Sequence, residues 1–320
     1  MAGWLIGHAF APGDIESATG SATYLAAAFA LLFTLSDGEG TLAMRLHAIG
    51  WAGAFMAAGS GAALLLQGAP AAIAAAFALL TFTAGVLSWA GLPFLRAPRF
   101  AIVMFFIVLV SDLESPVVLA CILAATGLVA LIAVASEHAL APDIARTDYS
   151  TLAIAWKKIV ANRRTALRFA ICYLAATALG WSAGRVIDET HPTWIAVSVL
   201  VVMWPDWQKS HQRVLQRVVG TMVGASLALG IAQFVKRPEA LVAILLALCY
   251  FVPFGAKRNY WLHCALMALL ILLGLDLASE AGFTRHVVEE RVADVLMGCS
   301  IAILGTLAAF HKRDRKVSDT

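Results

Sequence analysis

Charged residues are scarce in this sequence, and their scarcity argues against a soluble protein. Asp, Glu, Lys and Arg make up 13% of the 320 residues, about half of the ~25% share in ordinary soluble domains. Apolar residues make up 61%, and they form long runs that recur from residue 21 to residue 310. Such runs are typical of membrane helices, because backbone groups in lipid must find their hydrogen bonds within the segment. The sequence therefore predicts an all-α, polytopic membrane protein.

Several chemical patterns are also missing. No Gly-rich phosphate loop and no His-Glu-x-x-His run occurs, and no paired carboxylates fall within the apolar runs, so we expect neither ATP-driven transport by this chain nor an enzyme. The histidines show no metal-ligand spacing, and we expect no metal and no cofactor. The net charge of +3 is small, and the basic residues lie in short loops, so nucleic acid is not an expected partner.

Close cysteine pairs are absent as well. The five cysteines fall on separate apolar runs, and we interpret them as small buried hydrophobic residues. They are Cys121, Cys172, Cys249, Cys264 and Cys299.

The apolar runs predict eleven membrane spans. Three of them are shorter than the ~20 residues that cross a bilayer upright, and we expect 21–36, 99–112 and 192–206 to extend into their polar flanks. The eleven are 21–36, 46–67, 70–91, 99–112, 116–136, 168–187, 192–206, 217–235, 239–255, 260–276 and 291–310.

Lysine and arginine predict the orientation of these spans. Alternate loops place 18 of the 23 basic residues on one side of the membrane, and an excess of basic residues marks the cytoplasmic side. Eleven spans then put the amino terminus outside and the carboxyl terminus in the cytoplasm.

Two halves of the chain share a pattern. Tyr24–Asp37 is followed by Arg45, much as Trp194–Asp206 is followed by Arg213 and Arg217. Two further landmarks recur in the same order: Pro93-Phe94 with Pro253-Phe254, and Asp112-Leu113 with Asp276-Leu277. This predicts two parallel repeats of five and six helices, a symmetry that transporters use.

The repeats define the predicted domains. The sequence divides into a short periplasmic segment 1–20, a degenerate first repeat 21–136, a basic cytoplasmic linker 137–167, a second repeat 168–310 and a cytoplasmic tail 311–320. Within the linker, Leu152–Val160 fits either a solvated loop or a basic amphipathic helix on the inner leaflet.

A motif in the second repeat resembles the fusaric acid resistance (FUSC) family. In that family a Pro-x-Trp opens a helix that ends near a proline, and a polar link leads to Arg-hydrophobic-hydrophobic-Gly-Thr-x-x-Gly. The family's last helix opens with an arginine, an acid and a glycine. The matching positions are Pro192, Trp194, Pro205, Arg217, Gly220, Thr221 and Gly224, with Arg291, Asp294 and Gly298 in the last helix.

The resemblance covers residues 165–310 well and 20–136 as a weaker copy. The family is similar to bacterial aromatic-acid exporters and, more distantly, to plant aluminium-activated malate transporters. Two features depart from it: the chain has only a short linker where bacterial members often carry a large cytoplasmic domain, and its first half lacks most of the usual leading helix.

Basic residues at the cytoplasmic ends of two helices are the candidate anion pathway. Arg213 and Arg217 lie four residues apart on one helix face, where two guanidinium groups would grip a carboxylate. Arg45 and His47 are their counterparts in the first half. The alternative for all four is anchoring to lipid phosphate.

Other candidates lie towards the outer side. Either Trp194 or Trp181 is expected to stack on an aromatic substrate. Asp294, paired with Arg291, is the candidate for proton coupling; the alternative is that the pair only neutralises itself. Gly220, Gly224 and Gly298 are interpreted as helix-packing positions.

The resemblance implies an exporter of small organic anions in the bacterial inner membrane, with aromatic carboxylic acids as the main expected substrates. The expected driving force is the membrane potential or the proton motive force. The alternatives are an anion channel resembling the malate channels and a non-transporting scaffold or envelope-assembly protein. The expected partners are the organic anion, the lipid bilayer, a second copy in a homodimer and a periplasmic adaptor.

Overall fold

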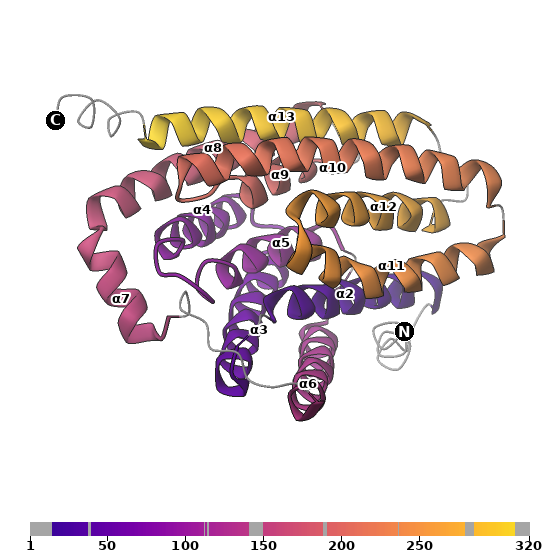
Figure 1. Ribbon diagram of the computed structural model, residues 1–320, viewed down its shortest axis with the longest axis horizontal. Coiled ribbons are helices and arrows are strands. Elements are labelled where there is room, and N and C mark those ends of the chain that lie inside the picture. Colours follow the sequence, from indigo (N-terminus) through magenta and orange to yellow (C-terminus); the bar gives the residue numbers. More distant parts are fainter. Residues whose placement is uncertain are drawn as a thin grey trace. The chain divides into compact units, whose positions relative to one another are not determined.

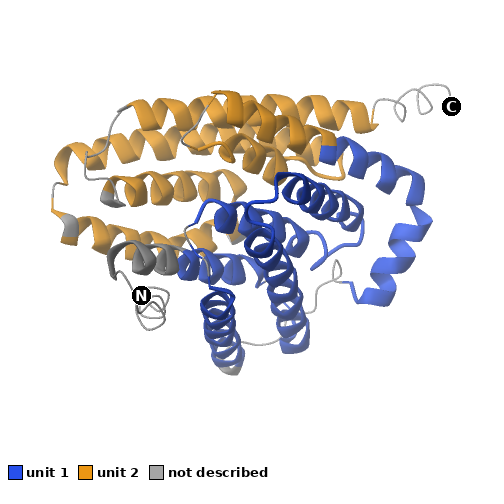
Figure 2. Cartoon of the chain, turned by 180° about the vertical axis from the view of Figure 1, so that it is seen from behind, with its two compact units in different colours: residues 1–174 blue, residues 175–320 orange. Residues whose placement is uncertain are grey.

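The structure is a computed structural model in which every described element is a helix. It describes residues 15–37, 40–111, 113, 115–140, 150–187, 191–235, 237–278 and 285–310. The predicted tail 311–320, residues 1–14 of the N-terminal segment and residues 141–149 of the linker lie outside these ranges. The chain forms two compact units, residues 1–174 and 175–320, which Figure 2 colours separately.

The first unit contains the predicted first repeat and linker. Its helices are α2 (Ile15–Ser36), α3 (Leu42–Leu65), α4 (Pro70–Leu87), α5 (Ala97–Leu109), α6 (Pro116–Leu140), α7 (Leu152–Ala161) and the first half of α8 (Arg163–Ile187) (Figure 1). Local signals set several starts: the Thr41 hydroxyl accepts a hydrogen bond from the Met44 amide at 3.4 Å, and Pro70 occupies the first turn of α4.

The second unit contains the rest of α8 and five further helices. These are α9 (Trp194–Val202), α10 (Trp207–Phe234), α11 (Pro238–Arg258), α12 (Tyr260–Ala278) and α13 (Arg285–Phe310). Around α10 and α12 a core of small and branched residues forms, including Ala225, Ala228, Leu272 and Leu273.

Five helix pairs recur between the units, whereas the weaker pairs α2 with α5 and α3 with α4 of the first unit have no comparable counterpart among the described residues of the second. In the first unit α3 packs against α5 and α6, α2 against α3 and α6, and α4 against α5. In the second unit α10 packs against α12 and α13, α9 against α10 and α13, and α11 against α12. When α2–α6 are matched in order with α9–α13, each of these pairs in one unit has a counterpart in the other. The pattern favours the internal repeat.

Among the described residues, seven helices are long and apolar enough to cross a membrane. They are formed by Leu42–Leu65, Pro70–Leu87, Pro116–His138, Arg163–Ile187, Trp207–Phe234, Glu239–Ala256 and His286–Phe310. Leu25–Ser36, Ala97–Leu109 and Tyr260–Asp276 form shorter apolar helices. The prediction of a multi-pass helical membrane protein is confirmed, whereas the number of eleven spans stays a prediction.

Helix α9 differs from expectation because it does not extend into its flanks. It ends at Val202, and Met203 has an extended backbone (ψ 120°). Pro205 explains why the helix does not continue past this region, because it pushes Trp204 out of the helical region and has no amide hydrogen of its own. The apolar segment 192–206 is therefore a short helix followed by non-helical chain.

The cysteines are less uniformly buried than expected. Cys264 and Cys299 are buried, Cys121 and Cys172 are half-buried, and Cys249 is exposed on α11. The interpretation as buried hydrophobic residues holds for two of the five, because an apolar helix in a membrane also presents small residues on its outer face.

Close packing of α10 on α12 gives a stability prediction. A Cβ at Gly224 would overlap the Ala265 carbonyl oxygen of α12, whereas a Cβ at Gly230 on the same helix meets nothing within 4 Å. We expect Gly224→Ala to lower the free energy of unfolding by about 1–3 kcal/mol, although alanine is the better helix former. We expect Gly230→Ala to leave it unchanged or raise it by up to about 1 kcal/mol. Unfolding in detergent, followed by tryptophan fluorescence, measures both; equal changes would contradict this packing.

Candidate functional site

A capped turn fixes the start of α10 beside the end of α9. The Asp206 carboxylate accepts a hydrogen bond from the Lys209 amide at 2.9 Å. The Ser210 hydroxyl accepts one from the Trp204 amide at 2.8 Å and donates to the Trp204 carbonyl at 3.0 Å. These bonds satisfy polar groups around the proline turn and set the direction in which α10 enters the bundle.

Arg217 lies further along α10 and is buried among the helices of the second unit. Its side chain reaches the α9 residue Ser198, whose hydroxyl accepts a hydrogen bond from a terminal guanidinium nitrogen at 3.3 Å. Tyr260 and Cys264 of α12 and Cys299 of α13 also lie within electrostatic range of the guanidinium. One cation is thus surrounded by side chains from four helices.

The polar groups at this site are incompletely satisfied. Within the described ranges, Arg217 Nε is buried without a hydrogen-bond partner, and no carboxylate is among the groups that act on Arg217, whereas the Tyr260 hydroxyl is. An arginine in a protein stays charged, and a buried charge without a counterion is costly. A guanidinium with unused donors in such a place is suited to binding an anion.

Glycines bring the surrounding backbones close to Arg217. A Cβ at Gly220 would overlap the Trp261 carbonyl oxygen of α12. A Cβ at Gly298 of α13 would lie 2.6 Å from the Cβ of Ser198. Glycine at these positions lets α10 approach α12 and lets α13 approach α9, which encloses the arginine in a narrow space.

Arg213 lies one turn before Arg217 and is held by aromatic rings. Its guanidinium carbon is 3.8 Å from the centroid of the Trp204 ring and 4.5 Å from that of the Tyr260 ring. Such cation–π contacts help to hold a partly buried guanidinium in place. Both arginines thus lie beside Tyr260.

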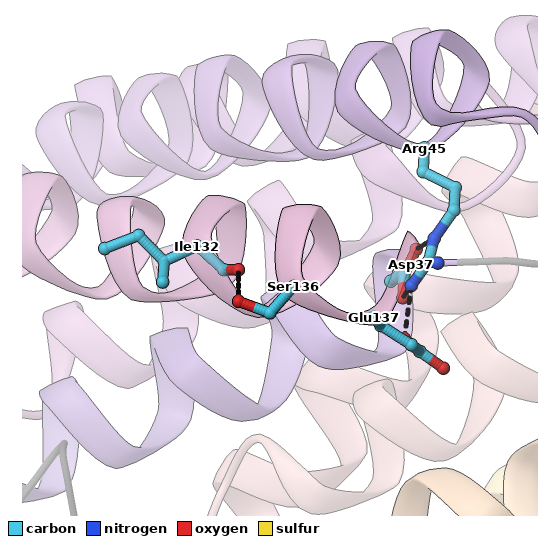
Figure 3. Close-up of polar contacts among 5 residues, drawn as sticks. All are labelled: Asp37, Arg45, Ile132, Ser136 and Glu137. Carbon is cyan, nitrogen blue, oxygen red and sulfur yellow. Dashed lines mark hydrogen bonds and ion pairs between the residues drawn. The ribbon is translucent and has the colours of Figure 1, made fainter. Parts of the chain in front are cut away.

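Arg45, the counterpart in the first unit, is charge-compensated. It makes two hydrogen bonds to Asp37, at 2.7 and 2.5 Å, and a 2.5 Å ion pair with Glu137 of α6. Figure 3 shows the three side chains converging, next to the Ser136 hydroxyl that donates to its own helix at the Ile132 carbonyl. Because it binds both carboxylates, the Arg45 guanidinium links the ends of α2, α3 and α6.

His47 packs into an aromatic cluster of the first unit. The Trp51 indole donates a hydrogen bond to His47 Nε2 at 2.9 Å, and the Phe94 ring centroid lies 6.4 Å from that of the imidazole. These contacts describe a packing role for His47.

The remaining candidates form a second cluster in the second unit. The His191 ring stacks on Trp194 with centroids 3.8 Å apart, and the Arg291 guanidinium carbon lies 4.4 Å from the Trp194 centroid. Asp294 follows one turn later on α13, and its side chain is buried. The structure thus brings Trp194 and Arg291 together, and the chain's own side chains occupy the ring on which a substrate was expected to stack.

Sequence reasoning missed two residues that complete the site around Arg217. Ser198 is a lone hydroxyl in the otherwise apolar run of α9, which is the signal that could have identified it. Tyr260 is the first residue of α12, next to Trp261, and its local sequence does not mark it as a site residue. Partners such as these come from distant segments, so spacing alone does not reveal them.

One sequence motif has no catalytic context here. Gly180–Gly184 spells Gly-x-Ser-x-Gly, which in hydrolases places the serine on a sharp turn between a strand and a helix. The structure has Ser182 in the interior of helix α8, where that geometry is absent.

Comparison with known proteins gives the relationship of the second unit. Residues 164–305 match the family model described as fusaric acid resistance protein-like. The inner membrane protein YccS of Escherichia coli is 29% identical over 136 residues, which make up 42% of this chain and 18% of that protein. The chain thus spans under a fifth of this relative's length. No solved structure matches the chain. The resemblance inferred from the motif is confirmed.

The contrast between the two buried arginines gives a prediction. We expect Arg45→Met to lower the free energy of unfolding by about 3 kcal/mol, because Asp37 and Glu137 are left facing each other. We expect Arg217→Met to leave it unchanged or to raise it by about 1 kcal/mol, because no carboxylate is left behind. Detergent-induced unfolding of the two variants measures the difference. An equally large loss for Arg217→Met would mean that the chain itself already compensates this charge.

Proposed function

Residues 164–305 form a fusaric acid resistance protein-like membrane segment, and from this premise we propose that the protein exports small organic anions across the inner membrane. Aromatic carboxylic acids are the proposed first substrate class, as the family resemblance implies. The observation that carries the proposal is Arg217, a buried guanidinium with an unused donor and no carboxylate partner among the described residues.

The membrane potential suffices as a driving force for such an exporter. With the inside negative, a potential of ~150 mV favours the exit of a monovalent anion by roughly 3.5 kcal/mol, or about a few hundredfold in concentration. The path then needs a place where a carboxylate exchanges its hydration for protein donors. Arg217 provides the charge for this exchange, and Arg213 lies one turn away against the Trp204 and Tyr260 rings.

The interruption of α9 supports a path beside Arg217. The nine helical residues of α9 cover about 13 Å, less than the ~30 Å of the hydrocarbon core, and the chain from Met203 to the start of α10 at Trp207 is not helical. Non-helical backbone at membrane depth is tolerated where protein buries it or where it lines a polar cavity, and transporters use such broken helices for their binding sites.

The proposed topology keeps eleven crossings with α9 as a broken one. It places the amino terminus outside and the carboxyl terminus in the cytoplasm, and it relates α2–α6 to α9–α13 as parallel repeats. The common packing pattern of the two units supports the repeat, and the excess of basic residues on one side supports the orientation. The homodimer and the periplasmic adaptor stay expectations from sequence.

Two other functions make different predictions. A channel, like the malate channels of the wider resemblance, would give single-channel currents, whereas an exporter gives slow, saturable flux. A scaffold would give no substrate-dependent flux. The buried, uncompensated Arg217 favours an anion path over the scaffold, since a scaffold gains nothing from a costly unpaired charge.

Efflux from proteoliposomes tests the proposal. The purified protein is reconstituted with benzoate and other aromatic and aliphatic carboxylates inside, under an imposed inside-negative potential without a pH gradient. We expect saturable efflux of aromatic carboxylates. Arg217→Ala should abolish it. Arg217→Lys keeps the charge but loses the fork, and should raise the half-saturation concentration about tenfold.

A matched variant controls for charge in general. Arg185 is an exposed arginine in the last turn of α8, and Arg185→Gln should leave efflux unchanged. If wild type shows efflux that Arg217→Ala and Arg217→Lys leave intact, Arg217 has no part in transport. If wild type shows no flux under a potential or a pH gradient, the export function is wrong.

A further inference from the structure

Helix α7 is attached to the first unit along one side. Ala155 is buried against Ala90 and Phe94. At the start of the helix, the Ser150 amide donates a hydrogen bond to the Leu92 carbonyl at 2.7 Å. These contacts fix the orientation of a helix of only ten residues, which would not be stable alone in water.

A different face of α7 carries an exposed apolar stripe. Leu152, Trp156 and Val160 follow one another at four-residue spacing, so they lie on one side of the helix. Their exposed fractions are 58%, 67% and 50%. A tryptophan exposed to this extent is typical of the boundary between lipid tails and headgroups, where its ring is apolar and its indole N–H stays hydrated.

The charges around this stripe are all positive. No acidic residue occurs between Thr151 and Ile171. Lys157, Arg163 and Arg164 are exposed, and no ion pair joins them to any described residue. A single-sign field with an apolar stripe in its midst is complementary to a surface that offers both negative charge and hydrocarbon.

The chain connection fixes where α7 lies relative to the bilayer. It ends at Ala161, and α8, a candidate membrane span, begins at Arg163. The exposed apolar residues Leu167 and Ile171 continue along α8. The stripe of α7 is therefore next to the point at which the chain enters the hydrocarbon, at headgroup depth.

We propose that α7 is an interfacial helix that binds anionic phospholipid, with Trp156 inserted below the headgroups and Lys157, Arg163 and Arg164 on lipid phosphates. This site is separate from Arg217 and does not depend on what the protein transports.

Brominated lipids test the proposal with the full chain. The protein is reconstituted in one mixture of phosphatidylcholine and phosphatidylglycerol, with bromine either on the phosphatidylglycerol or on an equal amount of phosphatidylcholine. The fluorescence of Trp156 is obtained as the difference between wild type and Trp156→Phe, whose unchanged melting temperature confirms folding. We expect brominated phosphatidylglycerol to quench it about twofold more strongly than brominated phosphatidylcholine.

Charge variants decide whether the headgroup is selected. In the combined Lys157→Gln, Arg163→Gln and Arg164→Gln variant, we expect both brominated lipids to quench Trp156 fluorescence equally. Arg185→Gln should behave as wild type. Equal quenching of wild type by both lipids would overturn the anionic selection. No quenching by either would mean that α7 is solvated, which would overturn the proposal as a whole.

Discussion

A buried positive charge without a negative partner among the described residues is the constraint on which the second unit depends. Arg217 cannot lose its proton, and its side chain is only 9% exposed, so the surrounding helices must hold it by weaker means. Ser198 supplies a hydroxyl at 3.3 Å, and Gly220 and Gly298 allow the neighbouring backbones to close around it. Such an arrangement sacrifices stability, and a protein keeps it where an incoming anion completes the site.

The first unit shows how the same fold behaves when the charge is compensated. Its arginine, Arg45, lies between Asp37 and Glu137 and ties the ends of α2, α3 and α6 together. If the two units descend from one repeat, one copy has kept an arginine as a fastening and the other has left it available to a ligand. This division explains why a chain with similar helix packing in both units places its candidate anion site in the second.

Much of the fold follows from the sequence because the membrane restricts the choices. Long apolar runs must be helices, and each predicted run overlaps an observed helix, although α10 begins at Trp207 and not at the predicted residue 217, because its first turns are polar. The end of α9 could have been expected from Pro205. The partners of the charged residues could not, because Arg45 and Glu137 are 92 residues apart and only packing of α3 on α6 brings them together. The same holds for Ser198 and Tyr260, whose roles depend on which helices meet at Arg217 and not on any local spacing.

Equilibrium binding of an aromatic carboxylate to the purified protein tests the central claim most directly. A ligand that binds only the folded state raises the melting temperature with its concentration. At constant ionic strength, benzoate should raise the melting temperature of wild type with the logarithm of its concentration above the Kd and should not raise that of Arg217→Gln, while benzyl alcohol, its neutral analogue, should affect both alike. An equal benzoate-dependent rise in wild type and Arg217→Gln would show that the anion binds elsewhere and would contradict the account.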